Sequence, residues 1–142
     1  MKKVMSALFA LVVLASMCVL TSCGSSAPSN EEVKKVVDKH DEGEELTEGD
    51  YSIAVDYLVA SFEEALPIMK KINDAQNDGD FEKAKKIKDE EIAKLEEKYK
   101  YTQDVLFILE GNCRENIIGE KNYKKIEDLR KKFKEEHFTL DI

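Results

Sequence analysis

The side chains with the most reactive chemistry in this sequence are three cysteines and two histidines. Cys18 and Cys23 lie near the N-terminus, Cys113 lies far from both, and the histidines are His40 and His137. A cysteine or serine nucleophile needs an activating base beside it, but no serine or threonine has a neighbouring histidine. The common cysteine-pair, histidine-pair, nucleophile-elbow and phosphate-loop patterns are also missing from the sequence. We therefore expect no catalytic residue, no cofactor and no enzymatic activity.

Cys23 stands at the end of a segment that has the order of a secretory signal. A basic start at Lys2 and Lys3 precedes an apolar run over residues 4–20, and small residues lead from there to the cysteine. The four residues Leu20-Thr21-Ser22-Cys23 resemble the lipobox of bacterial prolipoproteins. The resemblance implies cleavage between Ser22 and Cys23, thioether diacylation of Cys23, and usually acylation of its new amine.

Two other interpretations of this segment stay open. A transmembrane helix needs about 20 apolar residues, and this run is shorter and is followed by no basic stop-transfer cluster. An ordinary cleaved signal without lipid is the second interpretation. Two or three acyl chains, at about 0.8 kcal/mol per buried methylene, would give lasting attachment to the membrane. The lipobox therefore predicts a lipid-anchored protein of the bacterial cell envelope.

Gly24 bears on the choice of membrane. It stands where enteric lipoproteins that stay at the inner membrane carry an aspartate. The outer membrane is therefore favoured over the inner one if the cell is Gram-negative.

The chain is acidic, and its excess negative charge lies in the N-terminal part. It has 22 basic and 30 acidic side chains; residues 23–80 hold 5 basic and 15 acidic ones, whereas residues 81–142 hold 15 of each. Binding to nucleic acid depends on cations that neutralise phosphates, so no nucleic-acid partner is expected. The acidic part would also be repelled by an anionic bilayer. It serves either as a spacer that holds the domain off the membrane or for ordinary solubility.

Cys113 is the cysteine that remains if Cys18 leaves with the signal and Cys23 carries lipid. The mature chain then has no intrachain disulfide, and an odd thiol in an exported protein can pair between chains or react. We favour a small, buried apolar role for Cys113, because neither His40 nor His137 is near it in sequence. A homodimer through Cys113 and a reactive thiol are the alternatives.

Helical periodicity dominates the rest of the sequence, and no convincing period-two stretch occurs. A short helix is expected over about residues 30–40. A long helix begins after Thr47, whose spacing to Asp50 suits an N-terminal cap. It continues through Pro67 with a kink, because its apolar stripe stays in phase there, and it ends at the turn signal of residues 77–80.

A second long helical pattern runs from Phe81 to Leu109, weakened near Tyr101 and Thr102, and a last helix is expected over residues 119–136. Each apolar stripe needs a partner to bury it, and short connections favour antiparallel neighbours. The sequence therefore predicts an all-α fold, an up-down antiparallel bundle of three main helices, with room for a short fourth at the N-terminus. The expected organisation is a signal peptide over 1–22, a lipidated flexible acidic tether with a short helix over 23–49, and the bundle over 50–142.

The turn after the first long helix has part of a calcium-binding pattern. Asp74, Asp78 and Asp80 partly follow the ligand positions of an EF-hand loop, but position twelve is Lys85 where a glutamate should supply two oxygens. We therefore expect a capped helical turn and no metal site.

The plan of lipobox, serine-rich tether and small Lys/Glu-rich helical body resembles small helical lipoproteins of gut-type Gram-negative bacteria. We expect a non-enzymatic envelope module that contacts an unknown protein partner, because an anchor and a bundle occur without a catalytic constellation. The alternative is a small-ligand or peptide binder with a groove between its long helices, which apolar residues left exposed beside Pro67 would favour. Tyr57, Phe62, Met69 and Tyr99 either line such a groove or belong to the core, and their helical spacing favours the core.

Overall fold

The structure of the chain, a computed structural model, describes residues 26–140 and 142. The predicted signal peptide, its cleavage site and Cys23 therefore lie outside the described residues. All regular structure within the described part is helical, which confirms the all-α prediction. None of the helices described there is long and apolar enough to span a bilayer.

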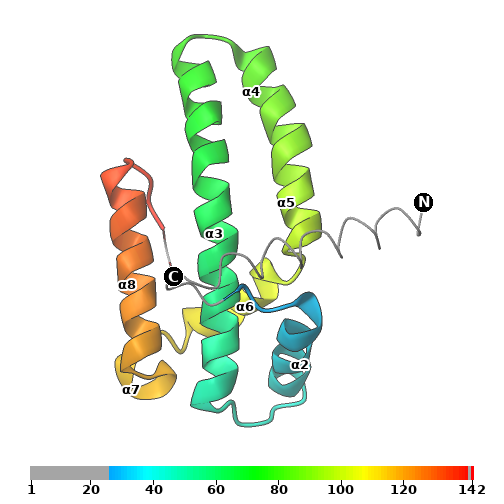
Figure 1. Cartoon of the computed structure of the whole chain (residues 1–142), viewed down its shortest axis with the longest axis vertical. Helices are drawn as coiled ribbons and strands as arrows, with labels where there is room; N and C mark the ends of the chain where they lie inside the picture. The colour runs from blue at the N-terminus through cyan, green and yellow to red at the C-terminus, as the bar shows by residue number, and fades with distance from the viewer. Residues whose placement is uncertain (1–25, 141) are drawn as a thin grey trace, which may run out of the picture.

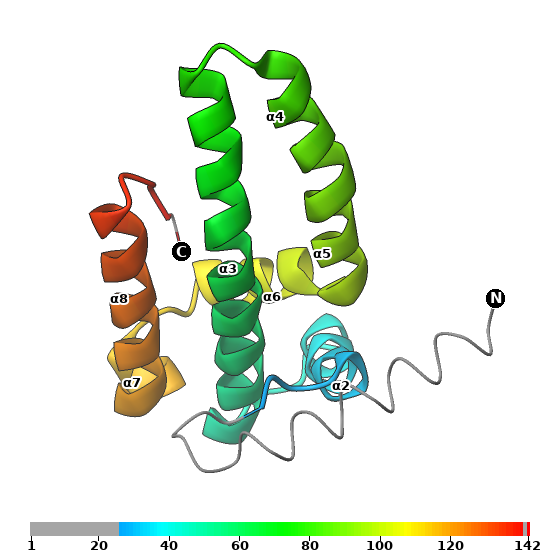
Figure 2. The same cartoon turned by 45° about the horizontal axis from the view of Figure 1, so that its top comes forward.

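The longest helix, α3, forms the axis around which the other elements are arranged (Figure 1). A rod made of α4, the π-helical segment η1 and α5 runs back along its C-terminal half, while α2 and α8 flank its N-terminal half and α6 crosses it (Figure 2). The bounds are α2 (Asn30–Asp41), α3 (Glu48–Asn77), α4 (Phe81–Ile87), η1 (Lys88–Ile92), α5 (Ala93–Lys98), α6 (Thr102–Glu110), α7 (Glu115–Ile118) and α8 (Glu120–Glu135).

Helix α3 starts and continues as the sequence predicts. The Thr47 hydroxyl accepts a hydrogen bond from the Asp50 amide, and the Asp50 carboxylate accepts one from the Thr47 amide at 3.0 Å. This reciprocal capping box satisfies amides that the first turn leaves without partners. The helix then runs through Pro67 without interruption, although proline removes one backbone hydrogen bond there. The kink expected at this position stays a prediction.

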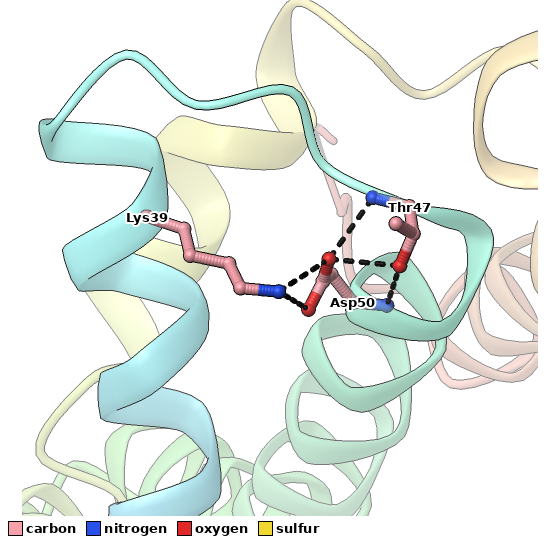
Figure 3. Close-up of polar contacts among 3 residues, drawn as sticks. All are labelled: Lys39, Thr47 and Asp50. Carbon is pink, nitrogen blue, oxygen red and sulfur yellow. Dashed lines mark hydrogen bonds and ion pairs between the residues drawn. The ribbon is translucent and has the colours of Figure 1, made fainter.

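The Asp50 carboxylate also joins α2 to α3. Lys39 of α2 reaches it with its ammonium, at 2.9 and 3.1 Å from the two oxygens (Figure 3). These hydrogen bonds, chiefly that from Lys39 and then those from Thr47, lower the pKa of the buried Asp50 carboxyl. Hydrogen bonds to the charged form favour that form, so the contact supports the α2–α3 junction at neutral pH.

We expect Asp50→Asn to lower the free energy of unfolding at pH 7 by about 1–3 kcal/mol, because charge-assisted hydrogen bonds are lost. A lowered folded-state pKa gives stability that is present above the unfolded pKa and is lost as the pH falls through the folded value. Urea titrations of both proteins should therefore converge between neutral pH and about pH 2. Asp78→Asn, at an exposed position, is the control. An equal loss at both pH values would contradict the electrostatic explanation.

The π-helical segment keeps an apolar stripe in phase. Ile87 and Ile92 are five residues apart, a step that would place them on different sides of a regular α-helix. The wider turn of η1 absorbs the additional residue, and both isoleucines are half-buried. The apolar periodicity predicts a regular helix over this stretch, and the five-residue step from Ile87 to Ile92 is the sequence signal for the π-helical turn.

Helix α2 contributes to the core. Val33 and Val36 are buried to 1 % exposure or less, in one cluster with Val55, Val105 and Ile126. These buried valines place α2 within the folded body, and residues 42–47 form a short connection from α2 to α3.

The chain turns sharply after α5, so the expected three-helix arrangement is not confirmed. The Tyr57 hydroxyl accepts a hydrogen bond from the Tyr101 amide at 3.2 Å, and the Thr102 hydroxyl donates to the Tyr99 carbonyl at 2.7 Å. These bonds hold residues 99–101 out of the helix and direct α6 across α3 (Figure 2). The weakened helical pattern near Tyr101 in the sequence therefore marks the point at which the rod ends.

Candidate binding groove

An apolar groove of about 320 Å³ opens where α3, α5 and the start of α6 meet. Its aromatic and aliphatic lining comes from α3, from the end of the rod and from the turn that follows it. Polar side chains stand at its edge. The lining residues are Ser61, Phe62, Ala65, Ile92, Leu95, Glu96, Tyr99, Lys100, Thr102 and Gln103. A concave, mostly apolar surface with a few polar groups is the usual form of a binding site.

Tyr99 is fixed at one end of this groove. Its ring packs edge-on against Tyr57 at a centroid distance of 5.2 Å, and its hydroxyl donates to Glu64 Oε1 at 2.7 Å. Lys98 also reaches Glu64 at 2.7 Å. Burial, and then the Glu64 carboxylate, raises the pKa of Tyr99, so the phenol stays protonated and acts as a structural donor.

The polar groups of the groove include one buried hydroxyl, that of Ser61, and neither histidine. The Ser61 hydroxyl donates to the Leu58 carbonyl at 2.9 Å, which ties it to its own helix. Neither histidine lines the groove: His40 packs against Phe107 at 5.9 Å, and His137 follows the end of α8. Ser61 therefore has no imidazole beside it, and the other polar side chains that line the groove are Glu96, Lys100, Thr102 and Gln103.

The apolar surface continues along the two-helix hairpin beyond the groove. Leu66, Met69 and Ile72 of α3 and Ile87 of α4 are half-buried. They do not belong to the core or to the partly buried residues packed against it, among the residues that the structure describes. In a pair of helices, each helix covers only the face of the other that it contacts, and apolar side chains beside that contact need a further element to bury them. The hairpin around Pro67 therefore carries half-buried apolar side chains, whereas the large apolar side chains exposed in the described residues are Phe81 and Phe107.

Cys113 lies apart from this groove. It is half-buried against the core, and burial raises the pKa of its thiol, with nearby Arg130 acting in the opposite direction. The thiol is therefore protonated at neutral pH, and a protonated thiol is a poor nucleophile. Its pairing between chains stays a prediction.

The acidic turn that partly follows a calcium loop serves as a helix connection. Asp80 accepts a hydrogen bond from the Lys83 amide at 3.0 Å and so caps α4, while Asp78 ends α3. The capped helical turn expected at these residues is confirmed.

Comparison with protein-family models, with curated proteins and with solved structures finds no match to this chain. The groove is therefore interpreted from its own residues. Phe62 and Tyr99 were candidates from the sequence, whereas Glu96, Lys100 and Gln103 were not. Their convergence depends on the turn after α5, for which the only sequence signal was the weakened pattern near Tyr101.

Proposed function

We propose that this chain is a lipid-anchored, non-enzymatic helical module of the bacterial cell envelope that acts through protein contacts. The observation that supports a contact surface is the apolar groove between α3, α5 and α6. The lipobox at Leu20-Thr21-Ser22-Cys23 supports the anchor, and Gly24 favours the outer membrane in a Gram-negative cell.

The composition of the groove suits a partner protein. Binding energy at protein interfaces concentrates in a few well-packed anchors that a polar edge shields from water. Phe62, Leu95 and Tyr99 supply apolar and aromatic surface, while Glu96 and Lys100 stand at the edge. A partner that places one or two apolar side chains in the groove would gain these contacts.

A photoreactive amino acid at Gln103 tests this function in the bacterium that encodes the chain. Gln103 is exposed and borders the groove, whereas Glu97 is exposed on α5 and does not border it. We expect a discrete protein adduct from position 103 and none from position 97. Leu95→Lys should abolish the adduct, because it places a charge among the apolar contacts. No adduct at position 103, or the same adduct from both positions, would contradict the proposal.

A small ligand is the second candidate, and the size of the groove is the observation that favours it. About 320 Å³ lies at the lower end of the range for small-molecule pockets. Such a ligand would raise the melting temperature of the protein by mass action. Thermal-shift screening in which no compound stabilises the wild type more than Leu95→Lys would remove this candidate.

A further inference from the structure

We propose that a second copy of this chain occupies the groove, with the two α5 helices antiparallel about a two-fold axis. The inference rests on the proposed function and names the partner of that surface. It is carried by the charges at the edge of the groove and by the half-buried apolar side chains of the hairpin.

Glu96 lies on α5 and Lys100 lies in the turn that follows it, four residues later, and both border the groove. Neither forms an ion pair within residues 26–140 and 142. The Lys100 ammonium lies 5.1 Å from the centroid of the Tyr101 ring, an exposed and therefore weak cation–π contact. Both charges are therefore available to a partner.

A neighbouring charge of the rod, Lys98, is already used within the chain. Lys98 binds Glu64 at 2.7 Å, which joins α5 to α3. This contact leaves Glu96 and Lys100 as the charged side chains that line the groove.

An acid and a base at this spacing are complementary to an antiparallel copy of themselves. In a two-fold interface, a residue that contacts a second residue of the other copy is contacted by it in return. Glu96 would therefore face Lys100 of the second copy, and Lys100 would face Glu96 of the second copy. One symmetric arrangement satisfies all four charges, whereas a ligand with a single charge would leave one of them without a partner.

The apolar surface beside these charges supports the same arrangement. Ala65, Ile92 and Leu95 are apolar residues of the groove wall, and the hairpin beyond them consists of only two helices. Two such hairpins would together supply four antiparallel helices, which is the number that encloses an apolar core in a simple bundle. Association would then bury half-exposed apolar side chains on both copies.

The test is a charge exchange measured by sedimentation velocity on the full-length, lipidated chain in detergent micelles. E96K gives two positive edge charges, and K100E gives two negative ones, so each homodimer should weaken by at least about tenfold. The double variant E96K/K100E restores opposite charges and should regain the wild-type dissociation constant. An equimolar mixture of the single variants should form mixed dimers. E97K and K94E change the same charges on α5 away from the groove and should leave the dissociation constant unchanged.

Three results would overturn the inference: a monomeric wild type at every concentration, single variants that dimerise as well as the wild type, or no recovery in both the double variant and the mixture. Circular dichroism of each variant separates loss of association from loss of folding. A monomeric chain that still gives the adduct at position 103 overturns the second copy and leaves the proposed function in place. A chain with neither property overturns both.

Discussion

Replacing Cys23 by serine is expected to abolish acylation and to release the protein from the membrane. Attachment is proposed to rest on this one residue, because the adjoining part of the chain is acidic and is repelled by anionic lipid. Two or three acyl chains hold a protein on the membrane, and none of the helices within residues 26–140 is long and apolar enough to replace them. The effect should therefore be almost complete rather than graded.

The measurement combines a clickable fatty acid with fractionation. The wild type should incorporate the label and stay with membranes after a high-salt wash. Cys23→Ser, exported behind a signal that the general signal peptidase cleaves, should carry no label and be recovered in the soluble fraction. Cys113→Ser is the matched control and should behave as the wild type. Retention of the Cys23 variant on membranes at high salt would require a different account of attachment.

Phe133→Ala is expected to give the largest loss of folding stability, about 3–5 kcal/mol. Phe133 of α8 is 1 % exposed, and its ring contacts Phe62 of α3 at a centroid distance of 5.6 Å and Phe138 at 6.5 Å. Truncation would leave a cavity where α8, α3 and the C-terminal segment meet. The lost transfer energy and the cavity act in the same direction.

Phe81→Ala removes the same side chain from a position that is 69 % exposed. This control should change the free energy of unfolding by less than about 0.5 kcal/mol. Urea titrations of the three proteins give the comparison directly. Similar small losses for both variants would mean that α8 does not pack on α3 through Phe133.

The predictions from sequence succeed where the determining contacts are local. The capping spacing of Thr47 and Asp50 starts α3, and the turn that ends at Asp80 ends α3 and starts α4. The last helix, expected over residues 119–136, is α8 at Glu120–Glu135. Each of these features is decided by hydrogen bonds and side-chain periods within a few residues.

The groove could not be predicted in the same way. Phe62 and Tyr99 were each identified as either core or groove lining, and an apolar residue at helical spacing fits both. The choice depends on whether another helix covers it. At Tyr99 the position of the ring is fixed by Glu64, which lies 35 residues away in sequence. The Glu64 carboxylate accepts a hydrogen bond from the Tyr99 hydroxyl.

The sequence by itself determined the helical class, the caps and most helix bounds of this protein, because these depend on contacts between near neighbours. Only the tertiary structure decided that the rod ends at Lys98 and that α6 turns across α3. The Tyr101 amide finds its acceptor in Tyr57, 44 residues earlier in the chain. A sequence shows which residues are apolar or can donate a hydrogen bond. Which partner each one meets is decided by the competition of all helices for the same buried surface.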